Sequence, residues 1–378
     1  MGQRQSALEE VGVNLAVRIT DPNFWRGRRV LLTGHTGFKG SWLSLWLQSM
    51  GVFLRGISLE PPTNPALFAV ARVAQGMQHR IVDIRDFAAV KAQMAEFQPD
   101  IVIHMAAQSL VRCSYQNPIE TYATNVMGTV HLLEAARQVA SARVVINVTT
   151  DKCYENHEWV WAYRENDPLG GYDPYSSSKG CSELVTSAYR RSFFGRSDSI
   201  ALASVRAGNV VGGGDWSFGR LIPDTLRALE TNTPVVIRAP IATRPWQHVL
   251  EPLSGYLVLA QSLYEEGEKF CGGWNFGPND EDTKSVQWVV ETMASKWGSS
   301  STWTRSGGDD LHEASVLKLD ITKAKSQLGW KPVWNIDKTL GKIIDWHKAW
   351  LGGADMRSLC EQQVADHQSD ARILLAQK

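Results

Sequence analysis

Short apolar runs alternate with longer segments of helical periodicity over the first half of the chain. The apolar runs lie at 30–32, 52–59, 81–84, 101–104, 143–148 and near Ser204-Val205-Arg206. Apolar residues recur at helical spacing in the segments between them, at 42–50, 87–97 and 118–139. Strands covered on both faces are apolar throughout, so this alternation predicts a parallel sheet with helices on both sides. The fold class that we expect is α/β, a Rossmann-like doubly wound parallel sheet with a smaller C-terminal substrate-binding lobe.

The pattern changes after Arg206, where glycine-rich and proline-punctuated segments replace the regular alternation. We therefore expect a dinucleotide-binding domain over 25–208. The following region, 209–357, is expected to form largely the substrate-binding lobe, interleaved with the first domain. Residues 1–24 read as a peripheral N-terminal extension with a short amphipathic piece at 8–17, and residues 358–378 read as a polar, loosely packed tail.

Composition narrows the class of partners. The chain has 39 basic and 39 acidic residues among 378, so no charge excess favours nucleic acid or a membrane surface. No apolar run approaches the roughly 18 residues that span a bilayer, and residues 1–29 lack the apolar core of a signal peptide. The five cysteines show no CxxC or Cys/His spacing, which favours reduced thiols and no metal site. These features predict a cytoplasmic protein.

A glycine turn closes the first predicted strand and opens the first helix. Its sequence is Gly34-His35-Thr36-Gly37-Phe38-Lys39-Gly40. Glycines let the backbone approach a pyrophosphate, whose charge then lies at the helix N-terminus. The GxxGxxG spacing alone also fits a simple tight turn, but the strand before it and the helix after it strengthen the nucleotide interpretation. Within the turn, Lys39 could reach a pyrophosphate or a 2′-phosphate.

Two later strand ends are consistent with an adenine dinucleotide. Asp83-Ile84 could accept a hydrogen bond from the adenine amino group, although Asp83 could instead cap a helix. Ala106-Ala107-Gln108 offers small residues against which a ribose can lie. The acidic residue that usually binds the ribose diol of NAD is missing, because Ser58 occupies that place by spacing. The residues therefore leave NAD against NADP open and suggest a loosely held cofactor.

The candidate chemistry lies in two short motifs. Thr150-Asp151-Lys152 follows the apolar run at 143–148, and Tyr175 and Lys179 stand one helical turn apart. We expect the Lys179 ammonium to lower the pKa of the Tyr175 phenol and to hold a cofactor ribose, so that Tyr175 can deprotonate a sugar hydroxyl during hydride transfer. An acid and a second ionisable group nearby suggest elimination of water after oxidation. Each motif alone has a simpler explanation, since YxxxK is common in helices and TDK could merely cap one.

Together these motifs resemble the extended short-chain dehydrogenase/reductases and, more narrowly, the CDP-glucose 4,6-dehydratases. The resemblance rests on GHTGFKGSW at 34–42, TDKCY at 150–154 and YSSSK at 175–179, and it extends over about 24 to 350. Relatives acting on dTDP- or GDP-sugars usually have glutamate at the position of Lys152. The resemblance implies conversion of CDP-D-glucose to CDP-4-keto-6-deoxy-D-glucose with NAD as cofactor, in deoxysugar synthesis for surface polysaccharide.

The resemblance also implies a role for each residue. Tyr175 would deprotonate the C4 hydroxyl, Thr150 would hold the C4 oxygen, and Asp151 would protonate the departing C6 oxygen, which requires a neutral acid. Lys152 would either remove the C5 proton, the role we favour, or stay charged and stabilise the enolate. The substrate-binding candidates are Asn209, Arg220, Leu221, Arg238, Arg244 and His248.

Several alternatives remain open from the sequence. Another nucleotide-sugar 4,6-dehydratase, acting on a dTDP- or GDP-sugar, would use the same residues. A 4-epimerase also oxidises C4 but needs no acid at C6, so Asp151-Lys152 argues against it. A cofactor-binding regulatory protein would be expected to have lost catalytic residues, and a scaffold for interactions has no signal in its favour. The helices at 118–139 and after Tyr175 commonly form a dimer contact in relatives, so we expect a homodimer.

Overall fold

The computed structural model of the chain describes residues 17–194, 200–299, 302–305 and 316–376. Within them, seven parallel strands form one sheet in the order β11-β6-β5-β4-β1-β2-β3. Their bounds are β1 (Arg29–Thr33), β2 (Phe53–Ser58), β3 (Gln78–Ile81), β4 (Ile101–His104), β5 (Val144–Val148), β6 (Ala201–Arg206) and β11 (Gly272–Asn275). The strand order reverses between β1 and β4, where ligands bind in doubly wound sheets. The predicted fold class is confirmed.

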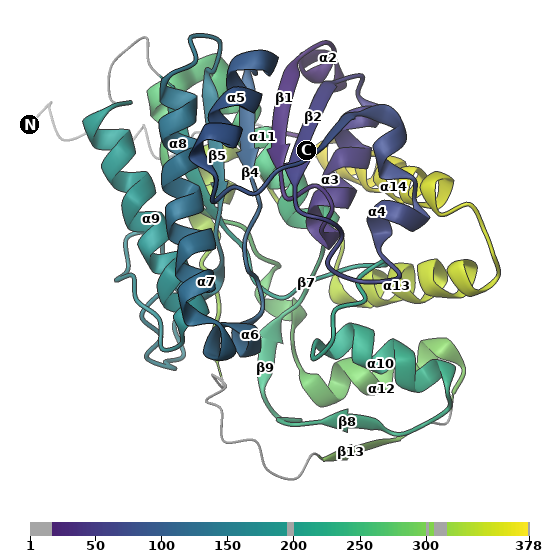
Figure 1. The fold of residues 1–378 in the computed structure, drawn as a ribbon. Helices are drawn as coiled ribbons and strands as arrows, with labels where there is room; N and C mark the ends of the chain where they lie inside the picture. Colours follow the sequence, from purple (N-terminus) through teal and green to yellow (C-terminus); the bar gives the residue numbers. More distant parts are fainter. Residues whose placement is uncertain (1–16, 195–199, 300–301, 306–315, 377–378) are drawn as a thin grey trace, which may run out of the picture.

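Helices cover both faces of the sheet (Figure 1). In β1, Val30 and Leu32 belong to one apolar core and Leu31 to the other, as the two-residue period of a strand requires. The first core includes residues of α3 (Phe38–Ser49) and α11 (Leu250–Glu266). The second includes residues of α5 (Phe87–Phe97), α8 (Gly128–Arg137) and α9 (Pro174–Ser192). Because both faces are covered, the central strands β1, β4, β5 and β6 are buried along nearly all their length, whereas the edge strand β3 is largely exposed.

A smaller lobe lies at the carboxyl end of the sheet, drawn at the bottom of Figure 1. It has its own apolar core, and three two-stranded sheets accompany it. Its elements are β7 (Val210–Val211) with β10 (Gln247–His248), β8 (Val235–Ile237) with β13 (Trp303–Arg305), β9 (Thr243–Pro245) with β12 (Thr283–Ser285), and the helices α10 (Leu221–Glu230), α12 (Val286–Trp297) and α13 (Ile336–Leu351). Since α11 and β11 return to the main sheet, the region after 209 is divided between the lobe and the sheet.

Short elements join the larger ones. They are α2 (Pro22–Trp25), α4 (Leu67–Val70), α6 (Val111–Gln116), α7 (Pro118–Tyr122), the short 3-10 helices η2 (Val73–Gly76), η4 (Asp151–Cys153), η5 (Gly267–Phe270) and η6 (Asp280–Asp282), and the π-helical turns η3 (Ala123–Met127) and η7 (Ala324–Leu328). Among the described residues, no helix is both long and apolar enough to cross a membrane.

Three sequence expectations about elements need correction. The strand expected at 81–84 is β3, which ends at Ile81 and leaves Asp83 in the loop after it. The helix expected at 118–139 consists of α7, η3 and α8, with the π-turn around Asn125. The expected loose tail is the helix α14 (Met356–Ala376), which packs against α3 and α13. The amphipathic piece expected at 8–17 lies almost entirely outside the described residues.

Candidate active site

The glycine turn packs very closely against the segment after β4. A Cβ on Gly34, whose φ is +77°, would lie 2.7 Å from the backbone nitrogen of Ala106. A Cβ on Gly40 would lie 2.1 Å from the carbonyl oxygen of Gly34. The backbones of the turn, the start of α3 and the segment after β4 therefore approach so closely that no side chain fits at either glycine. This cradle, with the N-terminus of α3 beside it, fits a pyrophosphate.

At the ribose end of the cradle, hydroxyl groups stand where NAD-binding sites usually have an acidic residue. Thr36 Oγ1 lies 2.8 Å from Ser58 Oγ and donates to the carbonyl oxygen of Leu59 over 2.9 Å. Sequence reasoning did not single out His35, whose Nε2 lies 2.6 Å from Nδ1 of His79. Burial, with a further contribution from His79, lowers the pKa of His35 to about 4, so this ring is neutral at physiological pH. NAD against NADP stays undecided at this position.

Asn125 connects the segment after β4 to α9, the helix that contains Tyr175 and Lys179. Asn125 accepts a hydrogen bond from the Gln108 backbone N–H at 2.9 Å and donates to the Gln108 carbonyl at 3.0 Å and to Ser178 Oγ at 2.9 Å. The Gln108 side chain bonds within its own loop and to Thr121. Asn125 thus holds 106–108 beside α9 and is a structural link between them.

The candidate adenine contacts lie at the rim of the cradle. Asp83 forms a 2.6 Å ion pair with Arg85, and the hydrogen bond from Arg85 lowers the pKa of the Asp83 carboxyl. Ile84 is buried against Gly128, where an added Cβ would lie 2.5 Å from Ile84 Cδ1. The adenine role of Asp83 therefore stays a prediction, with its carboxylate already engaged by a neighbouring cation.

The acid motif begins where β5 ends. Thr150 and Asp151 are both buried, and Thr150 Oγ1 donates to Asp151 Oδ1 over 2.9 Å. The Asp151 carboxylate lies directly on the backbone of Gly208, because a Cβ there would fall 1.8 Å from Oδ2. Gly208 is thus a site residue that sequence reasoning passed over. Lys152 follows on η4, and its side chain makes no hydrogen bond or ion pair within the described ranges.

Tyr175 enters the same site from the first turn of α9. The helix is capped by Asp173, whose Oδ1 accepts from the Ser176 backbone N–H at 3.0 Å. Burial raises the pKa of Tyr175 to about 12, while a hydrogen bond with Thr150 and the charge of Arg220 act in the lowering direction. Thr150 Oγ1 is hydrogen-bonded to Asp151 Oδ1 as well, so one threonine hydroxyl lies beside both the phenol and the acid.

The expected action of Lys179 on Tyr175 stays a prediction, because the hydrogen bond that Lys179 makes among the described residues has another partner. The Lys179 ammonium donates to the carbonyl oxygen of Val148 over 3.2 Å, so it faces the end of β5. Burial lowers the pKa of Lys179 to about 8, and Glu183 acts against that shift. Residues one turn apart on a helix share a face, but their side chains need not meet when one of them has another partner.

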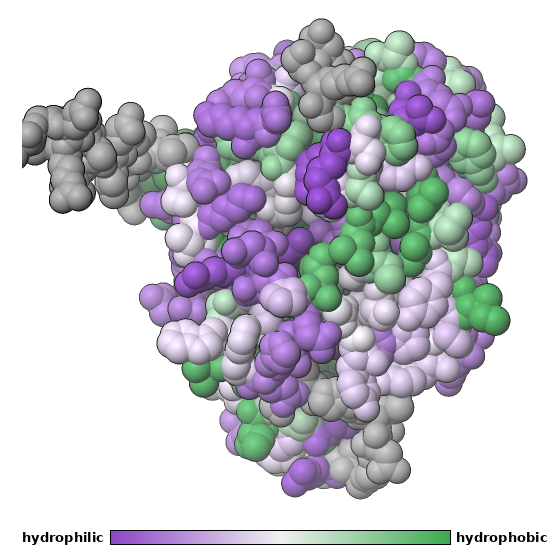
Figure 2. Space-filling view, turned by 90° about the vertical axis from the view of Figure 1, so that its left-hand side faces the viewer, coloured by the Kyte–Doolittle hydropathy of each residue, from purple (hydrophilic) through white to green (hydrophobic). Residues whose placement is uncertain are grey.

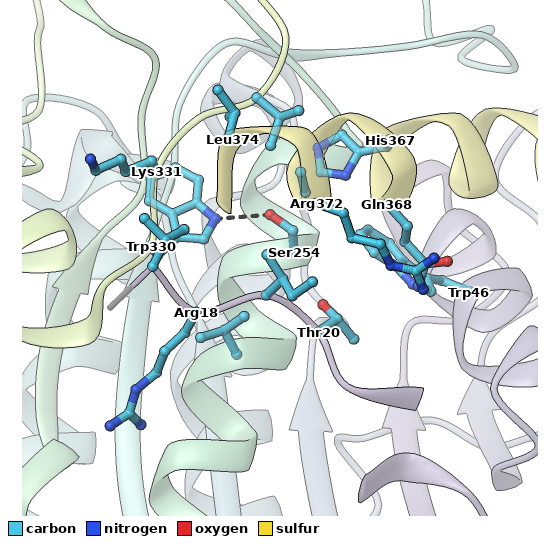
Figure 3. A pocket seen from close by; sticks show the side chains of 15 residues that line it. Arg18, Thr20, Trp46, Ser254, Trp330, Lys331, His367, Gln368, Arg372 and Leu374 are labelled. Carbon is cyan, nitrogen blue, oxygen red and sulfur yellow. Dashed lines mark hydrogen bonds between the residues drawn. The ribbon is translucent and has the colours of Figure 1, made fainter. Parts of the chain in front are cut away.

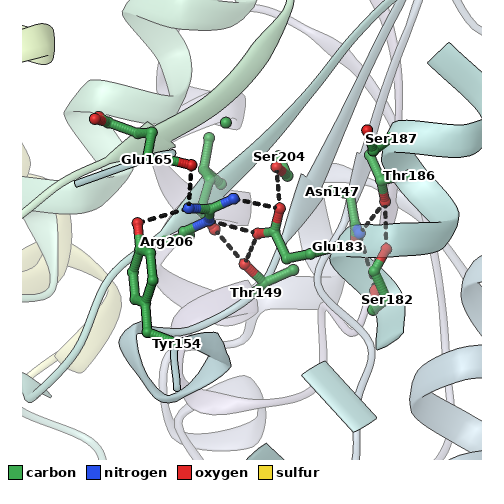
Figure 4. A network of polar contacts seen from close by, with 12 residues as sticks. Asn147, Thr149, Tyr154, Glu165, Ser182, Glu183, Thr186, Ser187, Ser204 and Arg206 are labelled. Carbon is green, nitrogen blue, oxygen red and sulfur yellow. Dashed lines mark hydrogen bonds and ion pairs between the residues drawn. The ribbon is translucent and has the colours of Figure 1, made fainter. Parts of the chain in front are cut away.

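A buried ionic network holds the catalytic helix to the sheet (Figure 4). The Glu183 carboxylate accepts from Arg206 Nη2 at 2.8 Å and Nε at 2.9 Å, from Thr149 Oγ1 at 2.5 Å and from Ser204 Oγ at 2.6 Å. Arg206 also donates to the hydroxyl of Tyr154 at 2.6 Å. Glu183 stands one turn after Lys179, and Thr149 immediately precedes Thr150. The network therefore fixes the helix of Tyr175 relative to the loop of Asp151.

The candidate substrate residues do not all lie together. Arg220 forms an ion pair with Asp215 at 3.1 Å and donates to Ser109 Oγ at 3.3 Å. Its charge also contributes to lowering the pKa of Tyr175 and of Lys39, so Arg220 belongs to the catalytic cluster. Leu221 begins α10 beside it. Asn209 has a φ of +49° and accepts a backbone hydrogen bond from Gln247.

The other three candidates lie in the lobe or in the core. Arg244 is part of β9, and Arg238 is exposed directly after β8. His248 is fully buried between the rings of Trp42 and Trp334, and its Nδ1 accepts from the Leu250 backbone N–H. This position inside the core corrects the expectation that His248 contacts substrate.

A separate small pocket lies at the N-terminal end of the described chain (Figure 3). It is formed by residues 17–20, α11 and α14 and is lined mainly by apolar and aromatic side chains, among them Trp46 and Trp330. Trp330 Nε1 donates to Ser254 Oγ over 2.8 Å at its wall. None of the catalytic candidates lines this pocket, so it is not part of the site described above.

The chain matches a known protein family and is similar to known relatives. A family model described as GDP-mannose 4,6 dehydratase matches residues 31–343. The chain is 58% identical over 353 residues to a CDP-glucose 4,6-dehydratase of Salmonella typhimurium, covering 92% of this chain and 98% of that protein.

Solved structures share the fold at lower identity. A dTDP-glucose 4,6-dehydratase of Streptomyces venezuelae, solved with NAD and TYD bound, has a TM-score of 0.74 at 23% identity, covering 86% of this chain and 99% of that one. A UDP-glucose 4-epimerase of Thermotoga maritima has a TM-score of 0.75 at 20% identity, with coverage of 85% and 99%. At these identities the likeness shows the fold alone.

Proposed function

Since the chain belongs to the GDP-mannose 4,6-dehydratase family within the extended short-chain dehydrogenase/reductases, we propose that it converts CDP-D-glucose into CDP-4-keto-6-deoxy-D-glucose and water. The observation that supports this most is the Thr150 hydroxyl, which lies between the phenol of Tyr175 and the carboxyl of Asp151. We infer that Tyr175 and Asp151 provide a base for C4 and an acid for C6 at the same end of the sheet. The 58% identity to a CDP-glucose 4,6-dehydratase supports the choice of nucleotide.

The cofactor is NAD, and the described residues fit it. The Gly34–Gly40 cradle and the N-terminus of α3 would hold its pyrophosphate, Lys179 its ribose, and Asp83 its adenine amino group. Bound NAD would supply a hydride acceptor for C4 and a hydride donor for C6, and a positive charge that favours the Tyr175 phenolate.

Oxidation at C4 depends on Tyr175. Burial keeps Tyr175 a neutral phenol at physiological pH, with its pKa at about 12. Thr150 and Arg220 are the groups of this chain that lower the pKa of Tyr175. The Thr150 hydroxyl can also form a hydrogen bond with the C4 oxygen. Tyr175 must therefore lose its own phenol proton when the cofactor binds, and the resulting phenolate takes the C4 hydroxyl proton as the hydride leaves the same carbon.

Elimination follows because a C4 ketone acidifies the proton on C5. A base removes this proton, the C6–O bond breaks, and Asp151 gives its proton to the departing oxygen, so that water leaves and a C5–C6 double bond remains. Lys152 is the base that we favour, since it follows Asp151 directly on η4 and its ammonium has no hydrogen-bond or ion-pair partner among the described residues. Hydride return to C6 and protonation of C5 then give the 4-keto-6-deoxy sugar.

Incubation of the purified protein with a panel of nucleoside-diphosphate glucoses, with and without added NAD, tests this function. Products with a 4-keto-6-deoxy sugar develop ultraviolet absorbance in alkali, whereas a 4-epimerase product does not. We expect the signal with CDP-glucose and an increase when NAD is added. A signal confined to dTDP-glucose or to a GDP-sugar would move the assignment to another dehydratase, and epimerised sugar without the absorbance would indicate an epimerase.

We also propose that the protein is a homodimer whose contact involves α7, η3 and α9. Ile119, Met127 and Leu184 on these elements are 85%, 47% and 60% exposed. Figure 2 looks onto the side of the molecule with α8 and α9 and shows apolar side chains gathered between hydrophilic ones. Sedimentation of the wild type and of a Leu184→Asp variant checks this, since the substitution should dissociate a dimer and leave a monomer unchanged.

A further inference from the structure

His104 is the last residue of β4 and stands directly before the segment 105–108, against which the cofactor ribose is expected to lie. It is 2% exposed. Its two ring nitrogens have different partners, because Nδ1 lies 2.7 Å from Thr33 Oγ1 and Nε2 lies 3.4 Å from Thr129 Oγ1. Thr33 ends β1 immediately before the glycine turn, and Thr129 belongs to α8. His104 therefore connects the cofactor cradle to a helix that covers the sheet.

The hydroxyl of Thr33 decides which nitrogen of His104 carries the proton. Thr33 Oγ1 accepts from the backbone N–H groups of Met105 and Ala106, both over 3.0 Å. A hydroxyl oxygen has two lone pairs and one O–H, so the O–H of Thr33 donates to His104 Nδ1. Burial, with a further contribution from the charge of Lys179, lowers the pKa of His104 to about 3, so the ring is neutral at physiological pH. Its one ring proton is then on Nε2.

Thr129, which this proton faces, belongs to a series of buried hydrogen bonds that reaches α9. Thr129 Oγ1 donates to the Asn125 carbonyl oxygen over 2.8 Å, so it accepts from Ser182 Oγ at 3.0 Å. Asn147 Nδ2 donates to Ser182 Oγ over 3.0 Å and to Thr186 Oγ1 over 2.7 Å (Figure 4). The direction of each hydrogen bond is thus fixed by the next one, from α9 to the glycine turn.

The Thr33 hydroxyl holds the segment after β4 against the glycine turn. A Cβ on Gly34 would lie 2.7 Å from the Ala106 backbone nitrogen, so the two backbones are in direct contact. The Ala106 N–H has no other acceptor among the described residues, so its place depends on the Thr33 oxygen. Asn125 holds the far end of the segment at Gln108. The surface that would face the cofactor ribose is therefore fixed at both ends.

We propose that His104 is a positioning residue for the cofactor: it accepts the Thr33 O–H, keeps both lone pairs of Thr33 for the 105–106 backbone, and so sets the width of the cradle. This inference rests on the proposed function, since it assigns the cradle to NAD. Without an acceptor at Nδ1, the Thr33 O–H would turn to another acceptor and the 105–106 backbone would lose its fixed place. The buried network of Glu183 and Arg206, which holds the catalytic helix, does not include Thr33. We therefore expect His104 to affect cofactor affinity more than turnover.

Calorimetric titration of NAD into the protein without substrate measures the cradle directly. His104→Phe keeps a buried ring and removes the acceptor, so the NAD dissociation constant should rise about tenfold, the equivalent of about one hydrogen bond. His104→Asn retains an acceptor on Cγ, where Nδ1 is attached in histidine, and should stay within about threefold of the wild type. Thr186→Val removes a buried hydroxyl at the far end of the same series and is the matched control, with an expected change of about twofold or less.

Thr33→Val removes the hydroxyl itself at nearly constant shape, and it remains informative if His104→Phe does not fold. We expect NAD binding about tenfold weaker in Thr33→Val. In the double variant with His104→Phe, binding should weaken by no more than about twofold beyond either single variant, because both changes act through one hydroxyl. Multiplied effects in the double variant would show that the two residues act separately and would overturn the proposal.

Steady-state kinetics with CDP-glucose separate positioning of the cofactor from chemistry. At saturating NAD, kcat of His104→Phe should stay within about threefold of the wild type, while the NAD concentration for half-maximal rate should rise about tenfold. A fall in kcat at saturating NAD with unchanged NAD affinity would place His104 in the chemistry and contradict the proposal.

The remaining outcomes distinguish this inference from the proposed function. If the wild type neither binds NAD nor forms the 4-keto-6-deoxy product, the proposed function fails and the role of His104 fails with it. If the wild type does both, and His104→Phe and Thr33→Val bind NAD as the wild type does with only a lower free energy of unfolding, His104 is a packing residue and the proposal alone is overturned.

Discussion

The junction of β5, β6 and α9 and the arginines of the lobe are built in opposite ways. At the junction, Glu183 and Arg206 are 3% and 4% exposed, and every oxygen of the Glu183 carboxylate accepts hydrogen bonds within the chain. In the lobe, Arg238 is exposed and Arg244 is half-buried on a three-residue strand. One region is fully determined by its own contacts, and the other leaves charged groups near solvent.

The difference indicates how the work is divided. Proton transfers need groups held within a fraction of an ångström, and a buried, fully bonded network around α9 provides that rigidity. Recognition of a nucleoside diphosphate needs guanidinium groups that can adjust to the ligand. Variants at the junction should therefore affect the turnover number and stability, and variants in the lobe should affect the Michaelis constant.

The largest expected effect is on turnover at the junction. Tyr175→Phe keeps the ring and removes the proton acceptor for C4, so kcat should fall about 10³-fold or more. The thermal unfolding midpoint should hardly change, because the hydroxyl interacts mainly with Thr150. Steady-state kinetics and calorimetry measure both, with the half-buried Tyr264→Phe as control. Retained turnover would remove Tyr175 from the mechanism.

The second effect is on stability. Glu183→Gln leaves Arg206 as a buried charge without its counter-ion, so the free energy of unfolding should fall by about 3–5 kcal/mol. Glu134→Gln removes the ion pair of Glu134 with Arg137 on the surface and should cost at most about 1 kcal/mol. Urea denaturation followed by circular dichroism compares the two. Similar losses in both variants would show that the junction is not special.

The same pair gives a smaller, pH-dependent effect. Burial alone would raise the pKa of Glu183, but Arg206 and the hydroxyl donors outweigh it and hold the pKa below its ordinary value of 4.5. The ionised pair therefore contributes fully above pH 4.5 and is lost as the pH falls through the folded-state pKa. The stability gap between wild type and Glu183→Gln should narrow below pH 4.5. A gap independent of pH would contradict an ionic origin.

The smallest effect belongs to the lobe. Arg244→Met should raise the KM for CDP-glucose about tenfold and leave kcat within about twofold, because a single charge-assisted contact is lost outside the reacting atoms. Arg80→Met is the control for loss of a surface cation, because Arg80 is exposed on the edge strand β3. A fall in kcat without a change in KM would place Arg244 at the chemistry and weaken the comparison.

The sequence predicted the elements whose signals are local. Gly34 and Gly40 were recognisable by spacing, because a tight turn between a strand and a helix tolerates no other residue. The apolar run of β5 and the motif after it were equally clear. Each of these features depends on neighbours within a few residues, so periodicity and spacing suffice.

Features that depend on distant partners were missed. Glu183 and Arg206 lie on different elements, and neither residue signals its partner. Lys179 donates to the carbonyl oxygen of Val148, a rotamer choice that helical spacing cannot specify. His248 is polar by type yet lies in the core.

The sequence does contain a signal for the C-terminal helix α14, where we expected a loose tail. Cys360, Val364, His367 and Ala371 recur at helical spacing and are among the residues that α14 buries. Polar residues around them hid this stripe. A narrow apolar stripe is enough for a helix that packs on the outside of other helices.

The central claim is that C4 oxidation and C6 dehydration occur on one sugar within one site, and the path of a single hydrogen tests it most directly. CDP-glucose deuterated at C4 is incubated with the protein and NAD, and the product is examined by nuclear magnetic resonance and mass spectrometry. The account predicts that deuterium moves from C4 to C6 of the 4-keto-6-deoxy product within one molecule. Deuterium found at C4 of an epimerised sugar, or lost to solvent, would contradict it.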